Sequence, residues 1–371
     1  MVDLKGQYDK IADQVNASIQ EVLDTTSYIN GPQVHEFQKN LENYLNVKHV
    51  IPCANGTDAL QIAMMALGLQ PGDEVITADF TFAATVEVIA LLQLKPVLVD
   101  VDLYNMNISI DAIKKAITPK TKAIVPVHLF GRAANMEAIM RIANDHNLYV
   151  IEDNAQAIGA NCKFSDGTKR KAGTIGHVAS TSFFPSKNLG CYGDGGAIFT
   201  NDDELAYKIR GIANHGMYVR YHHDVVGVNS RLDSIQAAVL NAKLPLLDQY
   251  SAARQNAARK YSLAFENHKN IVAPTICSIC DCHVFHQYTL RIIDADRDKL
   301  MEHLQSKGIP CAIYYPIPLH SQKAYRDDRY NEADFEITNL LVQQVISLPM
   351  HTELDDDQIE FITNSVKEFF T

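Results

Sequence analysis

One lysine, Lys187, lies between a hydroxyl-rich segment at 181–186 and a Gly-Asp-Gly-Gly run at 193–196. The proline before it and the glycines after it would fix the geometry of its loop, which a nucleophilic lysine requires. Asp153 ends an apolar run at 149–153, so we expect it at the end of a buried strand. Together these residues suggest a Schiff base between the lysine and pyridoxal phosphate, with the aspartate paired to the pyridine nitrogen.

Each of these residues also has a simpler interpretation. Lys187 could be a surface lysine beside a hairpin, and Asp153 could cap a helix, which is common at strand ends. A carboxylate against the pyridine nitrogen would keep that nitrogen protonated, so that the ring accepts electron density from a carbanion. If the chain turns after Asp153, the amide of Gln156 would point into the same site and could reach the ring hydroxyl; otherwise it is a solvated glutamine.

The phosphate of such a cofactor requires backbone amides and hydroxyl groups. Asn55-Gly56-Thr57 opens a helical pattern, and the free N–H groups and positive dipole end of a helix start suit an anion. Ser182, five residues before Lys187, could add a hydroxyl to the same phosphate. Phe82 follows a strand pattern and could lie flat on the cofactor ring, although a lone aromatic side chain is more often part of a core.

Strand and helix patterns alternate over the first two hundred residues. Strands are expected at 74–77, 96–100, 123–127, 149–153 and 197–200, and helices at 57–67, 110–116 and 136–146. Near-continuous apolar strands that alternate with helices favour an α/β fold, with a mostly parallel sheet covered by helices on both faces. Ligands of such sheets bind at the carboxyl ends of the strands, where Asp153 would stand.

The rest of the chain is typical of a smaller α+β domain. A helical pattern runs from Leu232 to Phe265, followed by expected strands at 286–293 and 311–315 and helices at 297–307 and 355–369. We therefore predict a large domain over residues 1–245 and a small C-terminal domain over residues 246–371, divided near Pro245. The N-terminal segment could pack on the small domain.

Composition limits the possible classes of function. The 371 residues are 47% hydrophobic and carry a formal charge of −11. An evenly acidic chain is a poor candidate for binding nucleic acid or an anionic membrane. The chain begins without a charged-then-apolar leader, and no apolar run approaches about 18 residues, so we expect a cytoplasmic protein.

The cysteines also limit the kinds of site. There are seven, an odd number and mostly scattered, which favours reduced thiols in a cytosolic chain. The exception is the run Cys277-x-x-Cys280-x-Cys282-His283, whose spacing could in principle bind zinc. A structural zinc site usually needs a second pair of ligands, and none stands out elsewhere. We therefore expect no metal site.

In combination, these motifs resemble the DegT/DnrJ/StrS family of nucleotide-sugar aminotransferases, within the fold type I pyridoxal-phosphate enzymes. The resemblance covers nearly the whole chain. Its landmarks in chain order lie at 29–32, 53–60, 71–76, 152–156, 182–196, 227–233 and 315–320. The resemblance implies a large domain with a mostly parallel sheet and a smaller C-terminal α+β domain.

The resemblance implies a role for each candidate residue. Lys187 would bind the cofactor covalently, and Asp153 would pair with the pyridine nitrogen. The other cofactor contacts would be Phe82 on the ring, Gln156 at the ring hydroxyl, and Gly56, Thr57 and Ser182 at the phosphate. Asn229 matches a position that reaches the phosphate from the neighbouring subunit, which implies a homodimer with shared active sites.

The resemblance also implies the reaction. Relatives that have histidine in place of Lys187 act as sugar dehydratases, so lysine favours transamination. L-glutamate would donate the amino group and a keto-sugar nucleotide would accept it, with Lys187 moving a proton during the transfer. The other classes considered are a cofactor-dependent dehydratase or epimerase, and a non-catalytic sensor that binds pyridoxal phosphate.

Several runs resemble most the UDP-2-acetamido-2-deoxy-3-oxo-glucuronate 3-aminotransferases, which make diacetamido-uronic acids for surface polysaccharides. In that subgroup an arginine and a loop of the neighbouring chain surround the uronate and diphosphate, and Arg231 and Arg220 are the matching candidates. Tyr314, where a histidine is common, and Tyr315 would also contact the substrate. Tyrosine donates a hydrogen bond but carries no positive charge at neutral pH. Another 3- or 4-keto sugar bound to UDP or dTDP is the alternative substrate.

Overall fold

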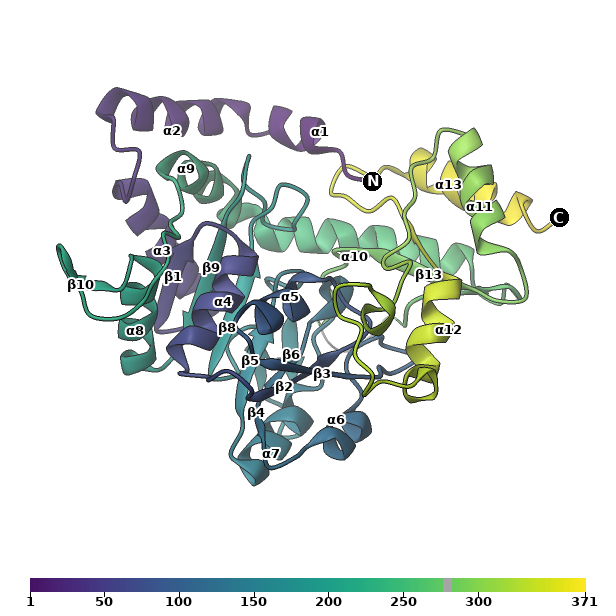
Figure 1. The fold of residues 1–371 in the computed structure, drawn as a ribbon. Helices are drawn as coiled ribbons and strands as arrows, with labels where there is room; N and C mark the ends of the chain where they lie inside the picture. Colours follow the sequence, from purple (N-terminus) through teal and green to yellow (C-terminus); the bar gives the residue numbers. More distant parts are fainter. Residues whose placement is uncertain (276–281) are drawn as a thin grey trace.

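A mostly parallel sheet forms the centre of the molecule (Figure 1). The computed structural model describes residues 1–275 and 282–371. The sheet strands within them are β1 (His49–Cys53), β2 (Glu74–Ala78), β3 (Lys95–Val99), β4 (Thr121–Val125), β5 (Tyr149–Asp153), β8 (Val178–Ser182) and β9 (Gly196–Thr200). Their order is β1-β9-β8-β5-β4-β2-β3, and β9 runs antiparallel to the other six strands. The expected parallel sheet is confirmed.

Helices cover both faces of this sheet because its strands are apolar on both sides. Ile151 belongs to the core of one face and its neighbour Val150 to the core of the other. The first face is covered by α4 (Gly56–Ala66), α5 (Ala84–Leu91) and α8 (Asp203–Ala213). The second is covered by α3 (Pro32–Leu45), α6 (Ile110–Ala116), α7 (Met136–His146) and α9 (Ser234–Lys243). This three-layer arrangement is the α/β fold that the sequence predicts.

Short strands and further helices lie outside these layers. Two antiparallel hairpins pair β6 (Asn161–Lys163) with β7 (Lys169–Lys171), and β10 (Met217–Val219) with β11 (His222–His223). At the N-terminus, α1 (Leu4–Asp9) precedes α2 (Ala12–Thr25), which packs on α9. No helix within residues 1–275 or 282–371 has the length and apolar character needed to cross a membrane.

A second core lies in the C-terminal part of the chain. Its sheet has the order β12-β13-β14 and packs against helices around Tyr261 and Leu300. The elements of this part of the chain are α10 (Leu247–Ala264), β12 (Ile271–Val272), β13 (Tyr288–Ile292), α11 (Arg297–Ser306), α12 (Glu336–Gln344), β14 (Val345–Leu348) and α13 (Asp356–Glu368). Of these, α12 packs its buried Leu341 into the core of the large sheet. The expected elements at 286–293, 297–307 and 355–369 correspond to β13, α11 and α13, whereas β12, α12 and β14 were not expected. Two of the expected elements differ from the structure.

The first difference is that the helical pattern from Leu232 to Phe265 is interrupted. A 3₁₀ turn at Leu244–Leu246, which contains Pro245, separates α9 from α10. Proline lacks the N–H group that a continuous α-helix needs, so the α-helical hydrogen bonding is interrupted there.

The second difference is that the strand expected at 311–315 is wrong. Only Ala312 pairs with the sheet, at Ser347 of β14. The segment then leaves the sheet edge, and its last two residues, Tyr314 and Tyr315, line a pocket instead.

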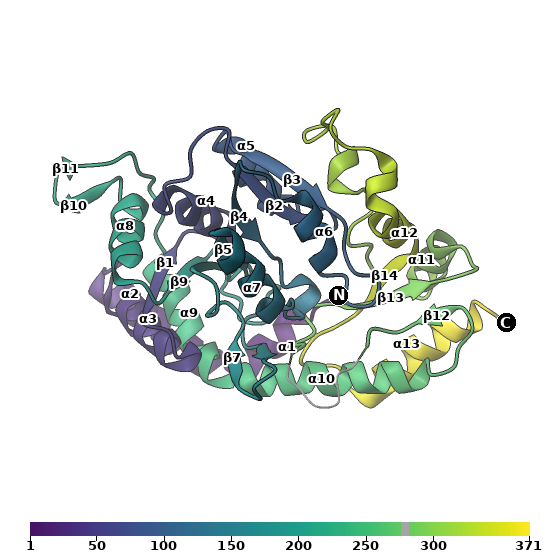
Figure 2. The ribbon, with the colours of Figure 1, turned by 90° about the horizontal axis from the view of Figure 1, so that it is seen from below.

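The long helix α10 contacts both cores (Figures 1 and 2). Leu247 at its start belongs to the core that α3 and α9 share, whereas Tyr261 near its end belongs to the C-terminal core. The N-terminal segment also reaches the C-terminal part, because the N–H of Met350 donates to the carbonyl of Met1 at 3.1 Å. The division of the chain into two domains at residue 245 stays a prediction.

Part of the cysteine-rich run cannot be compared with the structure. Cys277 and Cys280 lie outside the described residues. Within the described residues, no group of three or more histidine, cysteine, aspartate or glutamate side chains is arranged to hold a metal ion.

Candidate active site

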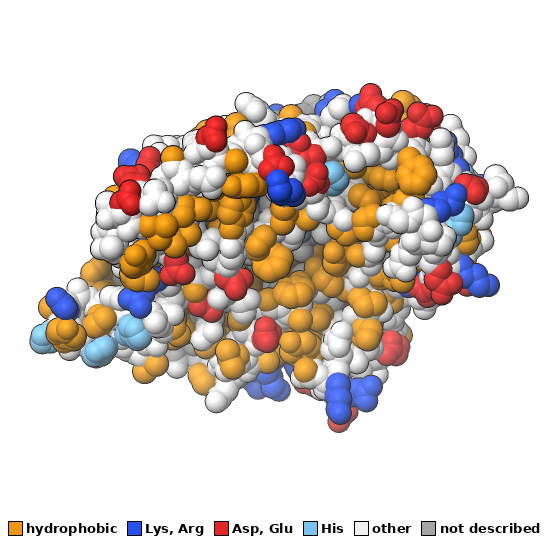
Figure 3. All heavy atoms as spheres, turned by 90° about the horizontal axis from the view of Figure 1, so that it is seen from above, with side chains coloured by type: hydrophobic (Ala, Val, Ile, Leu, Met, Phe, Trp, Pro, Cys, Tyr) orange, Lys and Arg blue, Asp and Glu red, His pale blue; other side chains and the backbone are white. Residues whose placement is uncertain are grey.

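A pocket of about 820 Å³ lies at the edge of the sheet where the parallel strands end. Loops that follow β1, β2, β5 and β8 supply much of its wall, as expected for ligand sites of such sheets. On this side of the molecule hydrophobic side chains gather across the middle, with charged ones around them (Figure 3). The pocket brings together nine predicted site residues: Gly56, Thr57, Phe82, Asp153, Gln156, Ser182, Lys187, Tyr314 and Tyr315.

A tight loop after β8 carries Lys187. The backbone N–H of Lys187 donates to the carbonyl oxygen of Phe184 at 2.8 Å. A Cβ atom on Gly190 would lie 2.4 Å from the carbonyl oxygen of Pro185, so only glycine allows this close approach. The constrained loop that the sequence predicts around the lysine is therefore present.

The side chain of Lys187 is half-buried in the pocket. Burial lowers the pKa of Lys187 to about 8, although the charge of Asp153 opposes this shift. A free lysine has a pKa of about 10.4. A larger fraction of the amine is therefore neutral near physiological pH, and only the neutral amine can attack an aldehyde.

Asp153 is buried at the end of β5. Its Oδ2 accepts a hydrogen bond from the hydroxyl of Thr85 at 2.7 Å, and its Oδ1 accepts one from the N–H of Ala155 at 3.2 Å. The chain after it forms a turn rather than a helix, so the helix-capping interpretation is wrong. Two neutral donors fix the carboxylate at the pocket wall, and its negative charge suits a protonated pyridine nitrogen.

The start of α4 and the end of β8 meet at one corner of the pocket. Asn55 caps the helix, because its Oδ1 accepts from the N–H of Asp58 at 2.8 Å. A Cβ atom on Gly56 would lie 2.8 Å from the Cβ of Ser182, so the glycine lets the helix start approach the serine. Free N–H groups of the first helical turn, with the Thr57 and Ser182 hydroxyls beside them, form a site that fits a phosphate.

Two side chains fit the ring of the predicted cofactor. Phe82 lines the pocket and is 57% exposed, which excludes the interpretation of a core residue. Its ring lies 6.1 Å from the ring of Tyr315. Gln156 is fixed by two bonds: its Oε1 accepts from the N–H of Phe130 at 2.6 Å, and its Nε2 donates to the Tyr315 hydroxyl at 3.1 Å. The chain does turn after Asp153, as required for Gln156 to enter the pocket.

Sequence reasoning missed His286, which lines the same pocket from the segment just before β13. Burial, with the positive charges of Lys187 and Arg254, holds the pKa of His286 well below its ordinary range. It therefore contributes a neutral imidazole at physiological pH. No sequence pattern indicated this residue, because it comes from a different core and is about one hundred positions from Lys187.

Three predicted residues do not line this pocket. Arg220 belongs to the β10–β11 hairpin, which projects from the body of the molecule in Figure 1, and its Nη2 donates to the Tyr221 hydroxyl at 3.1 Å. Asn229 is exposed and Arg231 half-buried. Ser230, between them, is anchored near the pocket, because its hydroxyl donates to Oδ2 of Asp58 at 2.6 Å.

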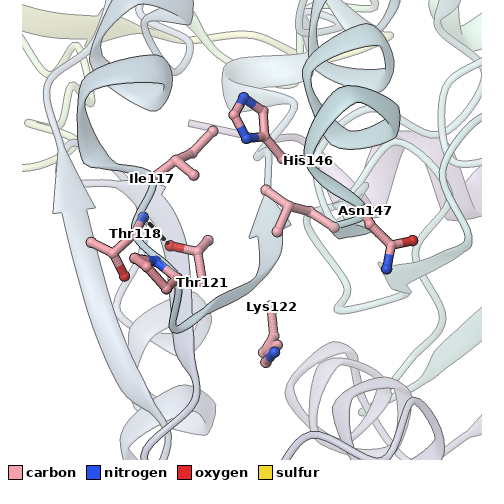
Figure 4. A pocket seen from close by; sticks show the side chains of 8 residues that line it. Ile117, Thr118, Thr121, Lys122, His146 and Asn147 are labelled. Atoms are coloured by element: carbon pink, nitrogen blue, oxygen red, sulfur yellow. Dashed lines mark hydrogen bonds between the residues drawn. The ribbon is translucent and has the colours of Figure 1, made fainter.

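A second hollow, of about 430 Å³, lies at the opposite edge of the sheet (Figure 4). It is lined by the start of β4 and the end of α7, including Lys122 and His146. Inside it the backbone N–H of Thr118 donates to the hydroxyl of Thr121 at 2.9 Å. None of the predicted catalytic residues lies there, so the chemistry is assigned to the pocket around Lys187.

Comparison with known proteins identifies the family to which this arrangement belongs. The model of the DegT/DnrJ/EryC1/StrS aminotransferase family matches residues 9–367. The chain belongs to this family. The sequence resemblance is thereby confirmed, and the chain is a pyridoxal-phosphate-dependent nucleotide-sugar aminotransferase.

Three relatives of this DegT/DnrJ/EryC1/StrS aminotransferase cover most of its length. UDP-2-acetamido-2-deoxy-3-oxo-D-glucuronate aminotransferase of Pseudomonas aeruginosa is 48% identical over 361 residues, which is 97% of each chain. A UDP-N-acetyl-3-dehydro-alpha-D-glucosamine 3-aminotransferase of Acidithiobacillus ferrooxidans is 42% identical over 369 residues, or 99% of this chain and 96% of the relative. The crystal structure of NtdA from Bacillus subtilis with bound cofactor PMP superimposes with a TM-score of 0.89 at 31% identity, covering 97% of this chain and 82% of that chain.

Proposed function

We propose that this aminotransferase transfers the amino group of L-glutamate to the 3-keto group of UDP-2-acetamido-2-deoxy-3-oxo-glucuronate, for surface polysaccharide biosynthesis. The observation that carries the reaction is the meeting of Lys187, Asp153 and the start of α4 in one pocket. The Pseudomonas aeruginosa relative, at 48% identity, supports the choice of substrate. Catalytic and binding roles of the individual residues below are part of this proposal.

Different residues of the pocket bind the cofactor and transfer the proton. Pyridoxal phosphate, when bound, supplies an aldehyde that takes up the amino group and a ring that accepts electron density. Asp153 keeps the pyridine nitrogen protonated, and the N–H groups at the start of α4 bind the phosphate. Lys187, with a pKa of about 8, accepts a proton from the α-carbon of the donor and returns it, because its neutral and charged forms are close in energy.

We also propose a homodimer in which each subunit completes the pocket of the other. Asn229, Arg220 and Arg231 do not line the pocket of their own chain, which fits residues that a second copy would bring to it. The loop between them exposes apolar side chains, with Val226 85% exposed and Tyr221 75% exposed. Such apolar exposure is typical of a surface that a partner covers.

Replacing Asn229 with alanine is expected to weaken the binding of pyridoxal phosphate by about 10- to 100-fold, because one hydrogen bond to a charged group is lost. Cofactor titration followed by absorbance measures this change, and Asn144→Ala, on the exposed side of α7, is the control. Mixed dimers then test sharing of the sites. At a cofactor concentration too low to fill Asn229→Ala dimers, equal amounts of Lys187→Ala and Asn229→Ala subunits should recover roughly a quarter of wild-type activity if sites are shared. Half of the dimers are then mixed, and each mixed dimer has one intact site of two. No recovery would contradict shared sites.

An absorbance spectrum of the purified protein, recorded before and after addition of L-glutamate, tests the proposed reaction. We expect a visible band from lysine-bound pyridoxal phosphate that moves into the near ultraviolet with glutamate. Keto-sugar nucleotides can then be ranked by the rate at which each restores the first band. A band that glutamate leaves unchanged would contradict glutamate as the donor. The absence of any band after addition of pyridoxal phosphate would overturn the whole proposal.

A second candidate acceptor is a neutral 3-keto sugar of UDP. Tyr314 has no positive charge with which to recognise a carboxylate, and it lines the pocket. The Acidithiobacillus ferrooxidans relative, at 42% identity, is named for such a neutral sugar. The substrate ranking above separates the two candidates directly.

The Arg231→Ala variant distinguishes the same two acceptors in another way. If Arg231 binds the carboxylate, this change should raise the KM for the uronate by about 10- to 100-fold. The KM for the 6-hydroxy analogue should change by less than about threefold, because this analogue has no carboxylate that the arginine could bind. Steady-state kinetics on both sugars measure the difference, with Arg141→Ala as the exposed control. Equal losses for the two sugars would contradict recognition of a uronate.

A further inference from the structure

A second buried lysine, Lys243, contacts the loop that carries Lys187. Lys243 ends α9 and is only 1% exposed. Its Nζ donates to the carbonyl oxygen of Gly190 at 2.8 Å and lies 4.4 Å from the ring centroid of Tyr192. None of the ion pairs within residues 1–275 and 282–371 includes Lys243.

Such a position is unfavourable for a charged amine unless it makes compensating contacts. Burial lowers the pKa of Lys243 to about 8, with Cys191 acting in the opposite direction. The contacts that compensate are the carbonyl of Gly190 and the face of Tyr192, both in the turn that closes the Lys187 loop. The ammonium group of Lys243 therefore contacts this turn, and within the described residues it forms no ion pair with a carboxylate.

A second residue of α9 holds the same turn. Oε1 of Gln236 accepts from the backbone N–H of Tyr192 at 2.9 Å. Gln236 and Lys243 are seven positions apart, which is close to two turns of an α-helix, so both side chains project from one face of α9. This face fixes the segment from Gly190 to Tyr192 at two points.

The position of this turn determines the position of Lys187. The N–H of Cys191 donates to the carbonyl oxygen of Phe183 at 2.8 Å, so residues 183–191 form a closed loop with Lys187 near its middle. Gly190 approaches the backbone of Pro185 too closely for any other residue. We therefore expect a shift of Gly190 to move this loop, Lys187 included.

We propose that Lys243 and Gln236 are positioning residues that hold the Lys187 loop in its reactive geometry, an inference that rests on the proposed role of Lys187. Neither residue lines the pocket. In this proposal they do not touch the cofactor or the substrate and act only by holding the backbone of the loop.

Lys243→Met tests this proposal, because methionine retains much of the side-chain volume and removes the amine. The first measurement is hydrogen–deuterium exchange of the protein without cofactor. The amides of Lys187 and Cys191 should exchange about 10-fold faster or more, because their loop opens more often. Lys208→Met, an exposed lysine on α8, should leave both exchange rates unchanged.

The second measurement is the glutamate half-reaction of the cofactor-loaded variant, followed by absorbance. Its rate should fall about 10- to 100-fold while the glutamate concentration at half-saturation changes by less than about threefold, since misplacement affects the reaction step more than binding. Wild-type exchange rates together with a wild-type half-reaction in folded Lys243→Met would overturn the proposal.

Gln236→Leu provides an independent test should Lys243→Met fail to fold, because Gln236 is only half-buried. It should change both measurements in the same direction, by about 3- to 10-fold. Unchanged exchange at Lys187 in this variant would also overturn the proposal. Failure of the wild-type protein to react with glutamate would instead contradict the proposed function, and the exchange measurements would still decide the role of the α9 face.

Discussion

The Lys187→Ala variant is expected to lose turnover by on the order of 10⁴-fold, the upper end of what one acid–base group contributes. In the proposed mechanism two functions of Lys187 disappear together: covalent binding of the cofactor, and movement of a proton during the transfer. The absence of a lysine-bound cofactor band measures the loss of covalent binding, independently of turnover. Steady-state production of the amino sugar measures the loss of the reaction.

Lys208→Ala is the control for the removal of a lysine, because Lys208 is exposed on α8. The start of α4 and Ser182 are unchanged in the Lys187→Ala variant, so it should still bind pyridoxal phosphate through the phosphate group. Turnover of this variant within tenfold of wild type would exclude Lys187 as the reactive amine.

The second large effect is expected for His128→Ala, which should lower the free energy of unfolding by about 3–5 kcal/mol. His128 and Glu152 are both fully buried, and Nε2 of the histidine lies 2.8 Å from Oε2 of the glutamate. Nδ1 accepts from the N–H of Ala134 at 3.1 Å, so Nε2 carries the proton that the glutamate accepts. Alanine would leave a buried carboxylate without this donor. Urea denaturation of the cofactor-free protein measures the change.

His128→Gln is the matched control, because it retains an N–H donor and should lose less than the alanine variant. Equal losses would show that packing volume, rather than the donor, determines the effect. His146→Ala, an exposed histidine at the end of α7, should leave the urea midpoint unchanged.

The stabilisation that this pair contributes should depend on pH in a defined direction. Burial alone would raise the pKa of Glu152, but its bonds to His128 and to the amides of Gly176 and Gly173 outweigh burial and hold that pKa below its ordinary value. The folded chain therefore releases this proton more readily than the unfolded chain. The stabilisation is present above the ordinary glutamate pKa of about 4.3 and is lost as pH falls through the lower folded value.

The sequence was most informative where chemistry and chain topology coincide. Asp153 was placed at a strand end by an apolar run, and a parallel sheet then brings neighbouring strand ends to one edge. The capping pattern at Asn55 predicted the start of α4. For these residues the local pattern and the global fold indicate the same position, so the pocket could be outlined before the structure was known.

Other positions depend on tertiary packing that no local pattern records. The periodicity between Leu232 and Phe265 continues across Pro245, although the helix does not. Tyr314 and Tyr315 end a segment with a strand pattern, but the structure places them in the pocket and not in the sheet. Lysine is a residue type that is usually solvated, whereas the structure buries Lys243 against the Lys187 loop.

The double anchoring of α10 determines where the chain can be recombined with its relatives. An exchange at residue 246 would replace Leu247 and Asp248 by residues of the relative, although both contact the part of the chain before the junction. Leu247 packs in the core that α3 and α9 share, and the carboxylate of Asp248 accepts from the hydroxyl of Tyr44 at 2.6 Å. Arg254, further along, donates to the carbonyl of Met350 at 3.1 Å and so belongs with the other core. Chimaeric enzymes made to alter sugar preference should therefore be joined inside the helix, between Asp248 and Arg254.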